Sequence, residues 1–207
     1  MKSMSNQLEM LKDWLGAGSI DIFGRPFSGK DTQAEKLAGI FGGLVVSGGE
    51  ILRSHHDPRE VEEILNSGGI VPSDFYLKLV LPYLSRLAFA DKPLILSAVG
   101  RSHGEEVDVI QAAEQSRHPI RAVILLDISE DEVWRRDGLS ADRKERGQRA
   151  DDTQKALELR LKKFEDQTMP VIDFYRNRDL LVEVDGSLPR EAVTEEILAK
   201  LAELAKR

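Results

Sequence analysis

Residues 24–33 read GRPFSGKDTQ, and this stretch decides the fold of the chain. An apolar segment precedes it at residues 20–23, and a helical pattern follows it at residues 34–38. A strand, a glycine-bounded turn, a lysine and a helix start together form a phosphate cradle, because loop N–H groups and the helix N-terminus face the anion. Lys30 stands where a side chain reaches the outer phosphates, so the stretch predicts a nucleoside triphosphate as ligand. The usual pattern has Ser or Thr directly after the lysine, whereas this chain has Asp31.

The helix that follows the loop is expected to add further donors. Thr32 and Gln33 fall in its first turn, where backbone N–H groups lack partners within the helix. We therefore expect these N–H groups to meet an α- or β-phosphate.

Composition narrows the class of protein. The 207 residues are 41% hydrophobic and 31% charged, which suits one globular domain with a full core. The net charge of −7 argues against a nucleic-acid or membrane-surface partner, since either would require a basic field. The absence of cysteine favours a reducing cytoplasm, and no run of about 18 apolar residues predicts a membrane span. We expect a cytoplasmic monomer that binds neither nucleic acid nor a membrane.

Strand and helix patterns alternate along the chain. The predicted strands are Ser19–Phe23, Leu44–Val46, Pro93–Leu96, Arg121–Leu126 and Leu180–Val184. Because helical patterns separate them, right-handed crossovers and a parallel sheet follow. The prediction is a three-layer α/β/α phosphate-loop fold, with a five-stranded parallel sheet, helices on both faces and a short lid. An extra helix is expected at residues 7–15, ahead of the first strand.

The second half of the chain contains the expected lid. Residues 137–152 are highly charged and almost free of large apolar side chains, so they predict a short surface lid rather than core. Pro170 is expected to break or kink the helix that follows. In the final helix, Ser187 is expected as the N-cap and Pro189 just inside it.

Arginines are concentrated in and around this lid. They are Arg135, Arg136, Arg143, Arg146, Arg149 and, on the following helix, Arg160. A charge run of this kind is usually a solvated loop. A neighbouring phosphate loop favours a functional role for these arginines, because phosphoryl transfer needs cations around the developing charge. We expect two or three of these arginines to act on phosphates and the rest to face solvent.

Several segments resemble those of the adenylate kinases, or more broadly of the nucleoside monophosphate kinases with a short lid. The matching segments, in chain order, are residues 24–38, 47–53, 69–73, 149–152, 168–175 and 181–186. They resemble the glycine-rich loop, the acceptor-phosphate segment, the turn closing the acceptor pocket, the lid exit and the C-terminal signature. The resemblance implies ATP as phosphoryl donor, Mg²⁺ as metal and a nucleoside monophosphate, first of all AMP, as acceptor.

The resemblance also implies a domain plan. A single domain would span residues 1–207, with the extra helix at 1–17. The remaining parts would be core segments 18–46 and 90–130, an acceptor region 47–89, the lid 137–152 and a C-terminal core 153–207.

Site residues follow from the same resemblance. Lys30 would bind the β- and γ-phosphates, and Arg53 and Arg101 the acceptor phosphate. Arg149 and Arg160 would clamp the transferring group, and all of these except Arg53 form the implied catalytic set. Other implied donor-site residues are Gly24, Ser28, Gly29, Asp31, Thr32, and Arg136 or Arg143 from the lid. Other implied acceptor-site residues are Gly48, Val71 and Glu105.

Four positions depart from the family's pattern. Phe27 replaces a loop glycine, where a positive φ is expected. Asp31 replaces the glycine after the lysine. Ser97 replaces an aspartate that helps to orient hydrated Mg²⁺, and Glu105 replaces a glutamine that binds the acceptor base.

Asp31 permits two interpretations. A carboxylate beside bound phosphates repels them, which would weaken the site. With Mg²⁺ present, the same carboxylate supplies an oxygen ligand of the kind this ion prefers. We hypothesise that Asp31 is a metal ligand and substitutes for the carboxylate missing at Ser97.

Glu105 also permits two interpretations. An ionised glutamate only accepts hydrogen bonds, so it would suit the two donors of guanine and would favour GMP. Alternatively, Glu105 is a solvated helix residue and the base is bound elsewhere.

Two rival functions remain at this point. One is a nucleotide-binding protein of the same fold with weakened or lost turnover, which Phe27, Asp31 and Ser97 favour. The retained lysine and acceptor arginines argue against it. The other is a kinase of this fold with a non-nucleotide acceptor.

Overall fold

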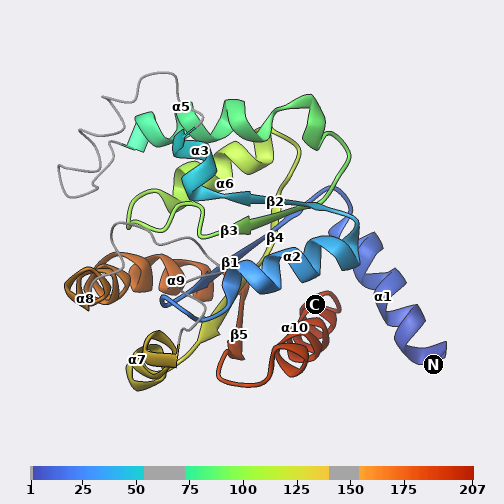
Figure 1. Cartoon of the computed structure of the whole chain (residues 1–207). Helices are drawn as coiled ribbons and strands as arrows, with labels where there is room; N and C mark the ends of the chain where they lie inside the picture. Colours follow the sequence, from blue (N-terminus) through green and yellow to red (C-terminus); the bar gives the residue numbers. More distant parts are fainter. Residues whose placement is uncertain (1, 54–72, 140–153) are drawn as a thin grey trace.

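A parallel β-sheet forms the centre of the molecule (Figure 1). The computed structural model describes residues 2–53, 73–139 and 154–207. The strands are β1 (Ser19–Gly24), β2 (Leu44–Ser47), β3 (Leu94–Ser97), β4 (Ile120–Asp127) and β5 (Leu181–Asp185), in the order β2-β3-β1-β4-β5. Every neighbouring pair is parallel. All five predicted strands and the three-layer α/β fold are confirmed.

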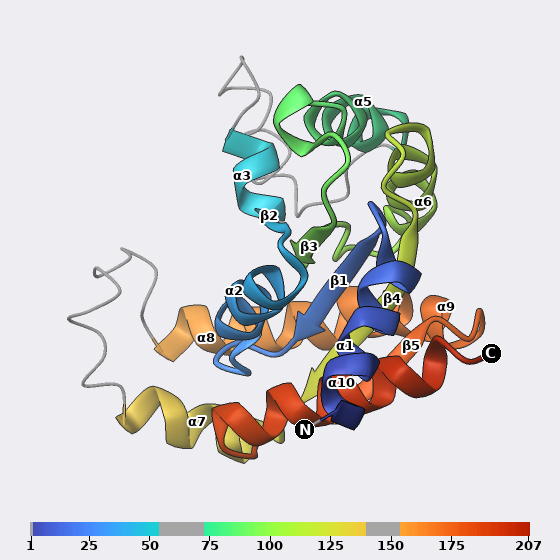
Figure 2. The same cartoon turned by 90° about the vertical axis from the view of Figure 1, so that its right-hand side faces the viewer.

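Helices cover both faces of the sheet. In chain order they are α1 (Lys2–Leu15), α2 (Lys30–Phe41), α3 (Gly48–Arg53), α5 (Ser73–Leu84), α6 (Glu106–Gln115), α7 (Glu130–Leu139), α8 (Gln154–Lys163), α9 (Met169–Arg176) and α10 (Arg190–Leu204). Short turns of 3₁₀ and π helix lie at Leu87–Phe89 and Phe164–Thr168. Helices α1, α2 and α10 pack on one face, and α5, α6 and α9 on the other (Figures 1 and 2).

Alternation along β1 explains the two cores. Ile20 and Ile22 are buried in the cluster formed with α1, α2 and α10. Phe23 is buried on the opposite face, where it packs with α9. Successive side chains of a strand point to opposite faces, and a central strand with both faces covered therefore needs apolar residues on both.

The expected extra helix is confirmed as α1. Leu11 and Leu15 of α1 are fully buried in the same cluster as residues of α10, and the two helices lie side by side (Figure 2). No helix among the described residues has the length and apolar character required to cross a membrane.

The C-terminal helices depart from a regular path at Pro170. A π-helical turn, Phe164–Thr168, ends α8, and α9 begins at Met169 with Pro170 in its first turn. The α-helix is thus interrupted just before Pro170, in agreement with the predicted break or kink, because a proline inside a helix removes a backbone hydrogen bond.

The expected N-cap of α10 is wrong. Pro189 occupies the cap position, without a side-chain cap hydrogen bond. The hydroxyl of Ser187 instead donates to the Asp185 carboxylate at 2.5 Å. Ser187 therefore belongs to the turn after β5, and its hydroxyl bonds within that turn instead of capping the helix. Of the predicted lid, residues 137–139 end α7, and residues 140–152 lie outside the described part of the chain.

Candidate phosphate-binding site

The loop between β1 and α2 turns back sharply over the N-terminus of α2. Gly24 permits the close approach, because a Cβ there would lie 2.4 Å from Ser28 Oγ and 2.8 Å from the Leu126 carbonyl oxygen. Gly29 adopts φ +89° and is the N-cap of α2. Lys30 is the first residue of α2, with Asp31 and Thr32 in the same turn. The predicted strand, loop, lysine and helix start are thus arranged as an anion site requires.

Ser28 contributes an unused hydroxyl to this loop. Its N–H donates to the Arg25 carbonyl at 3.1 Å. Its Oγ is buried and has no hydrogen-bond partner among the described residues. Buried polar atoms are normally satisfied, so a ligand oxygen suits this position. The expectation for Gln33 is wrong, because its backbone N–H donates to the Gly29 carbonyl at 3.0 Å and is not free for a phosphate.

Phe27 takes the backbone conformation expected of the glycine that it replaces. Its φ is +63°, in the left-handed region that side chains rarely adopt. Its side chain packs against a cluster formed by Ile128, Val133, Leu157 and Leu161. The phenyl ring therefore joins the loop to α7 and α8, and this packing offsets the strain of the backbone.

The two departures at Asp31 and Ser97 lie together. Ser97 ends β3, and its hydroxyl donates to the Asp31 carboxylate at 2.8 Å. No group of three or more His, Cys, Asp or Glu side chains in the described part of the chain could hold a metal ion. A Mg²⁺ ion fits here only as this ion usually binds, through one carboxylate and otherwise through phosphate and water oxygens. The Asp31 oxygens suit that arrangement.

The loop after β3 carries two of the residues that are predicted to bind the acceptor, Arg101 and Glu105. Arg101 is exposed, and its carbonyl accepts from Thr168 Oγ at 2.9 Å. Gly48, at the start of α3, lies against the same loop, since a Cβ there would be 2.9 Å from the Ala98 carbonyl oxygen. The structure therefore brings these two predicted acceptor segments together.

Glu105 is not the solvated helix residue of our second interpretation. It is only 6% exposed, and its carboxylate accepts from the Ser102 N–H at 3.1 Å. Burial raises its pKa to about 7, while the Ser102 hydrogen bond and the charge of Arg101 oppose the rise. The carboxylate lies in the loop that carries Arg101.

Asp21 was missed by our reasoning from sequence. It is fully buried in β1, its Oδ1 accepts from the Val99 N–H at 3.4 Å, and its Oδ2 has no hydrogen-bond partner among the described residues. Burial raises its pKa to about 8. The carboxyl group is therefore protonated at neutral pH and joins β1 to the loop that carries Arg101. The available signal was an acidic residue inside an apolar strand.

Arg136 anchors the phosphate loop from α7. Its guanidinium donates to the Phe27 carbonyl at 3.0 Å, to the Gly186 carbonyl at 2.8 Å and to Glu132 at 2.6 Å. These contacts are with the protein itself, and the expected contact with a donor nucleotide stays a prediction.

The other predicted residues have simpler outcomes. Arg53 ends α3, and Arg160 is half-buried on α8. Val71, Arg143 and Arg149 lie outside the described residues, so their roles stay predictions.

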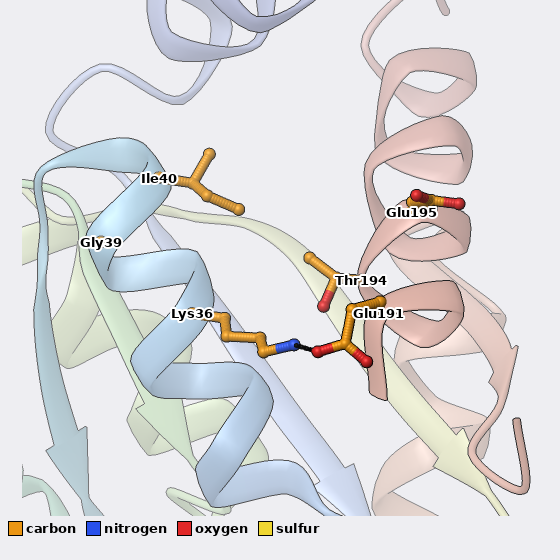
Figure 3. Close-up of a pocket in the computed structure, with 6 residues that line it drawn as sticks. All are labelled: Lys36, Gly39, Ile40, Glu191, Thr194 and Glu195. Atoms are coloured by element: carbon orange, nitrogen blue, oxygen red, sulfur yellow. Dashed lines mark hydrogen bonds and ion pairs between the residues drawn. The ribbon is translucent and has the colours of Figure 1, made fainter. Parts of the chain in front are cut away.

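A shallow groove of about 390 Å³ lies between α2 and α10, away from the phosphate loop (Figure 3). It is lined by Lys36, Gly39, Ile40, Glu191, Thr194 and Glu195. Lys36 and Glu191 form an ion pair across it at 3.0 Å. The buried Gln33 side chain donates to the Arg190 carbonyl and accepts from Thr194, one of the lining residues. These contacts fasten α2 to α10.

The fold and the loop define a phosphate-loop α/β protein. A family model described as adenylate kinase matches residues 22–180. The chain belongs to the adenylate kinase family.

Individual relatives agree with this assignment. The adenylate kinase of Cyanothece sp. (strain PCC 7425 / ATCC 29141) is 30% identical over 181 residues, which are 85% of this chain and 91% of the relative. That of Stenotrophomonas maltophilia (strain R551-3) is 32% identical over 187 residues, 87% of this chain and 97% of the relative. A solved gluconokinase from Sinorhizobium meliloti 1021 superposes with a TM-score of 0.58 at 23% identity, over 91% of this chain and 94% of the other. This last likeness concerns the fold alone.

Phe27 offers a test of strain against packing. Both Phe27→Ala and Phe27→Gly remove the contact with the cluster on α7 and α8, so both should lower the free energy of unfolding. Glycine adopts positive φ without strain, so Phe27→Gly should be the more stable variant by about 1 kcal/mol. Urea unfolding of the three proteins measures this. An alanine variant as stable as the glycine variant would show that the backbone is not strained.

Asp21 predicts a pH-dependent stability. The pKa of Asp21 is raised in the folded protein, so its protonated form contributes its full stability below the ordinary pKa of 3.8. This contribution is lost as the pH rises toward about 8. The advantage of the native protein over Asp21→Asn should therefore fall by at least about 2 kcal/mol between about pH 5 and about pH 9. Urea unfolding across this range measures it. Glu105 titrates in both proteins, so its contribution cancels in the difference between them. Stability curves of the two proteins that run parallel across this pH range would contradict a buried, neutral Asp21 carboxyl group.

Proposed function

We propose that the protein is a nucleotide kinase that transfers the γ-phosphoryl group of ATP to a nucleoside monophosphate, with AMP as the first candidate. The observation that carries the proposal is the loop from Gly24 to Lys30, which faces the N-terminus of α2 in a chain of the adenylate kinase family. The unused hydroxyl of Ser28 supports an anionic ligand at this loop. A monomeric, cytoplasmic protein stays a prediction of the sequence.

The chemistry would be direct in-line transfer without a covalent enzyme intermediate. Lys30 would neutralise the β- and γ-phosphates, and Arg101 would hold the acceptor phosphate from the loop after β3. Arg160, with Arg149, would neutralise the transferring group. Catalysis of this type depends on positioning and on cations around the developing charge rather than on acid–base groups.

Mg²⁺ is part of the proposal. When bound, it neutralises charge on the β- and γ-phosphate oxygens. Asp31 would hold the ion, and the hydroxyl of Ser97 would orient the Asp31 carboxylate through their 2.8 Å hydrogen bond. The pair would thus replace the aspartate that the family has at position 97.

The rival of an inactive nucleotide-binding protein is less well supported. Its evidence was Phe27, Asp31 and Ser97. Phe27 keeps the positive φ of the loop and packs away into the cluster beside α7 and α8. Asp31 and Ser97 form a hydrogen-bonded pair rather than two separate losses. These contacts favour an active site over a silenced one.

A coupled assay of ADP formation tests the function. We expect turnover with ATP and AMP, and calorimetry should detect ATP binding. A panel of nucleoside monophosphates tests the choice of base, and a clear preference for GMP would favour Glu105 as the residue that binds guanine. ATP binding without turnover for any acceptor, including sugar acids, would contradict the proposed kinase activity.

Exchange of the paired residues tests the metal site. Asp31→Gly should lower turnover by roughly 10- to 100-fold and raise the Mg²⁺ concentration needed for half-maximal activity, because the carboxylate is lost. The double variant Asp31→Gly, Ser97→Asp restores the family's arrangement. It should recover most of the turnover and return the Mg²⁺ requirement close to that of the native protein. Steady-state kinetics with varied Mg²⁺ measures this, with Asp31→Asn as a control for the charge alone. An unchanged Mg²⁺ requirement and rate in Asp31→Gly would contradict the role of Asp31.

A further inference from the structure

Arg25 joins the phosphate loop to several other elements of the described part of the chain. Its Nη1 donates to Asp127 Oδ1 at 2.9 Å and to the Ile128 carbonyl at 2.7 Å. Its Nε and Nη2 donate to Glu165 Oε1 at 3.1 and 2.6 Å. The guanidinium carbon also lies 5.2 Å from the centre of the Phe164 ring. The Arg25 side chain therefore binds other parts of the protein itself, and it joins the phosphate loop to the end of β4 and to the π-helical turn.

The π-helical turn also contacts the loop after β3 that carries Arg101, the acceptor loop. This turn, Phe164–Thr168, ends with Thr168, whose hydroxyl donates to the Arg101 carbonyl at 2.9 Å. It continues directly from α8, which carries Arg160. One short segment thus contacts the donor loop through Arg25, contacts the acceptor loop through Thr168, and continues into the helix of Arg160. Turns of π helix are frequent at functional sites.

The chemistry of arginine suits this connection. A planar guanidinium can donate to two carboxylates and a carbonyl at once, in fixed directions, whereas an ammonium is a single flexible point charge. Asp127 and Glu165 have side chains that are 63% and 51% exposed, so ion pairs of this kind add little to stability. The contacts therefore define geometry more than they stabilise the fold.

We propose that Arg25 is a positioning residue that sets the placement of the phosphate loop relative to Arg160 and Arg101, through its contact with the π-helical turn. The inference rests on the proposed function, because it concerns the alignment of donor and acceptor phosphates. A displacement of about 1 Å between reacting groups can cost on the order of 100-fold in rate. Loss of the contact should therefore affect steps that need both sites and spare binding at the loop alone.

Binding measurements separate these effects. Calorimetry with ATP reports on the phosphate loop, whereas a ligand with two adenosines joined by five phosphates must occupy the donor and acceptor sites together. In Arg25→Ala, the affinity for the bridging ligand should fall by at least about 10-fold, and the affinity for ATP by less than about 3-fold. Turnover should fall with the affinity for the bridging ligand, and the melting temperature should change little.

The two carboxylates provide matched controls. Glu165→Gln removes the charged partner in the π-helical turn and should reproduce most of the effect. Asp127→Asn removes the charged partner on β4, which does not contact the acceptor loop, and should have little effect. Arg25→Lys should give an intermediate loss, because an ammonium retains the charge but cannot make all the contacts.

Equal losses for ATP and the bridging ligand, or equal effects of Glu165→Gln and Asp127→Asn, would overturn the inference. So would a native protein that does not bind the bridging ligand. A native protein that binds the ligand but turns over no acceptor would contradict the proposed kinase activity, while the binding pattern of the variants would still support or overturn the role of Arg25.

Discussion

The backbone path from Gly24 to Lys30 is the constraint on which the site depends. No side chain fits at Gly24, because Ser28 and the Leu126 carbonyl occupy the space where a Cβ would lie. The chain consequently turns back and directs the N-terminus of α2, with its positive dipole end, toward the loop. β1 is the central strand of a parallel sheet, so the residues that follow β3 and β4 become neighbours of this loop. The segments predicted to bind the donor and the acceptor meet there for that reason.

Large side chains join this loop to the neighbouring elements. Phe27 packs into the cluster beside α7 and α8, Arg136 binds the Phe27 carbonyl, and Arg25 binds β4 and the π-helical turn. A glycine at position 27 would make the backbone easier to bend but would lose the packing. The two departures in this region, Phe27 and Asp31, each have a partner in a neighbouring element. These contacts tie the loop to β4, α7, α8 and the π-helical turn.

Local patterns predicted most of the fold but only part of the site. The strands and the break at Pro170 were predictable because apolar periodicity and the missing proline N–H act over a few residues. The positive φ at Phe27 followed from the glycine expected at that position. The N-cap assigned to Ser187 was wrong because its hydroxyl bonds to Asp185 within the preceding turn. Glu105 could not be placed either, since its burial depends on how the loop after β3 packs onto α6.

The sequence by itself determined the phosphate loop, the order of strands and helices, and the family, because these rest on residues adjacent in the chain. Only the tertiary structure decided which side chains become partners. Ser97 is 66 residues from its partner Asp31, and Glu165 is 140 residues from Arg25. The buried carboxyl of Asp21 likewise reaches Val99, 78 residues away. Parallel crossovers carry the chain across the sheet between such partners, and no local pattern encodes which residues then meet at its carboxyl edge.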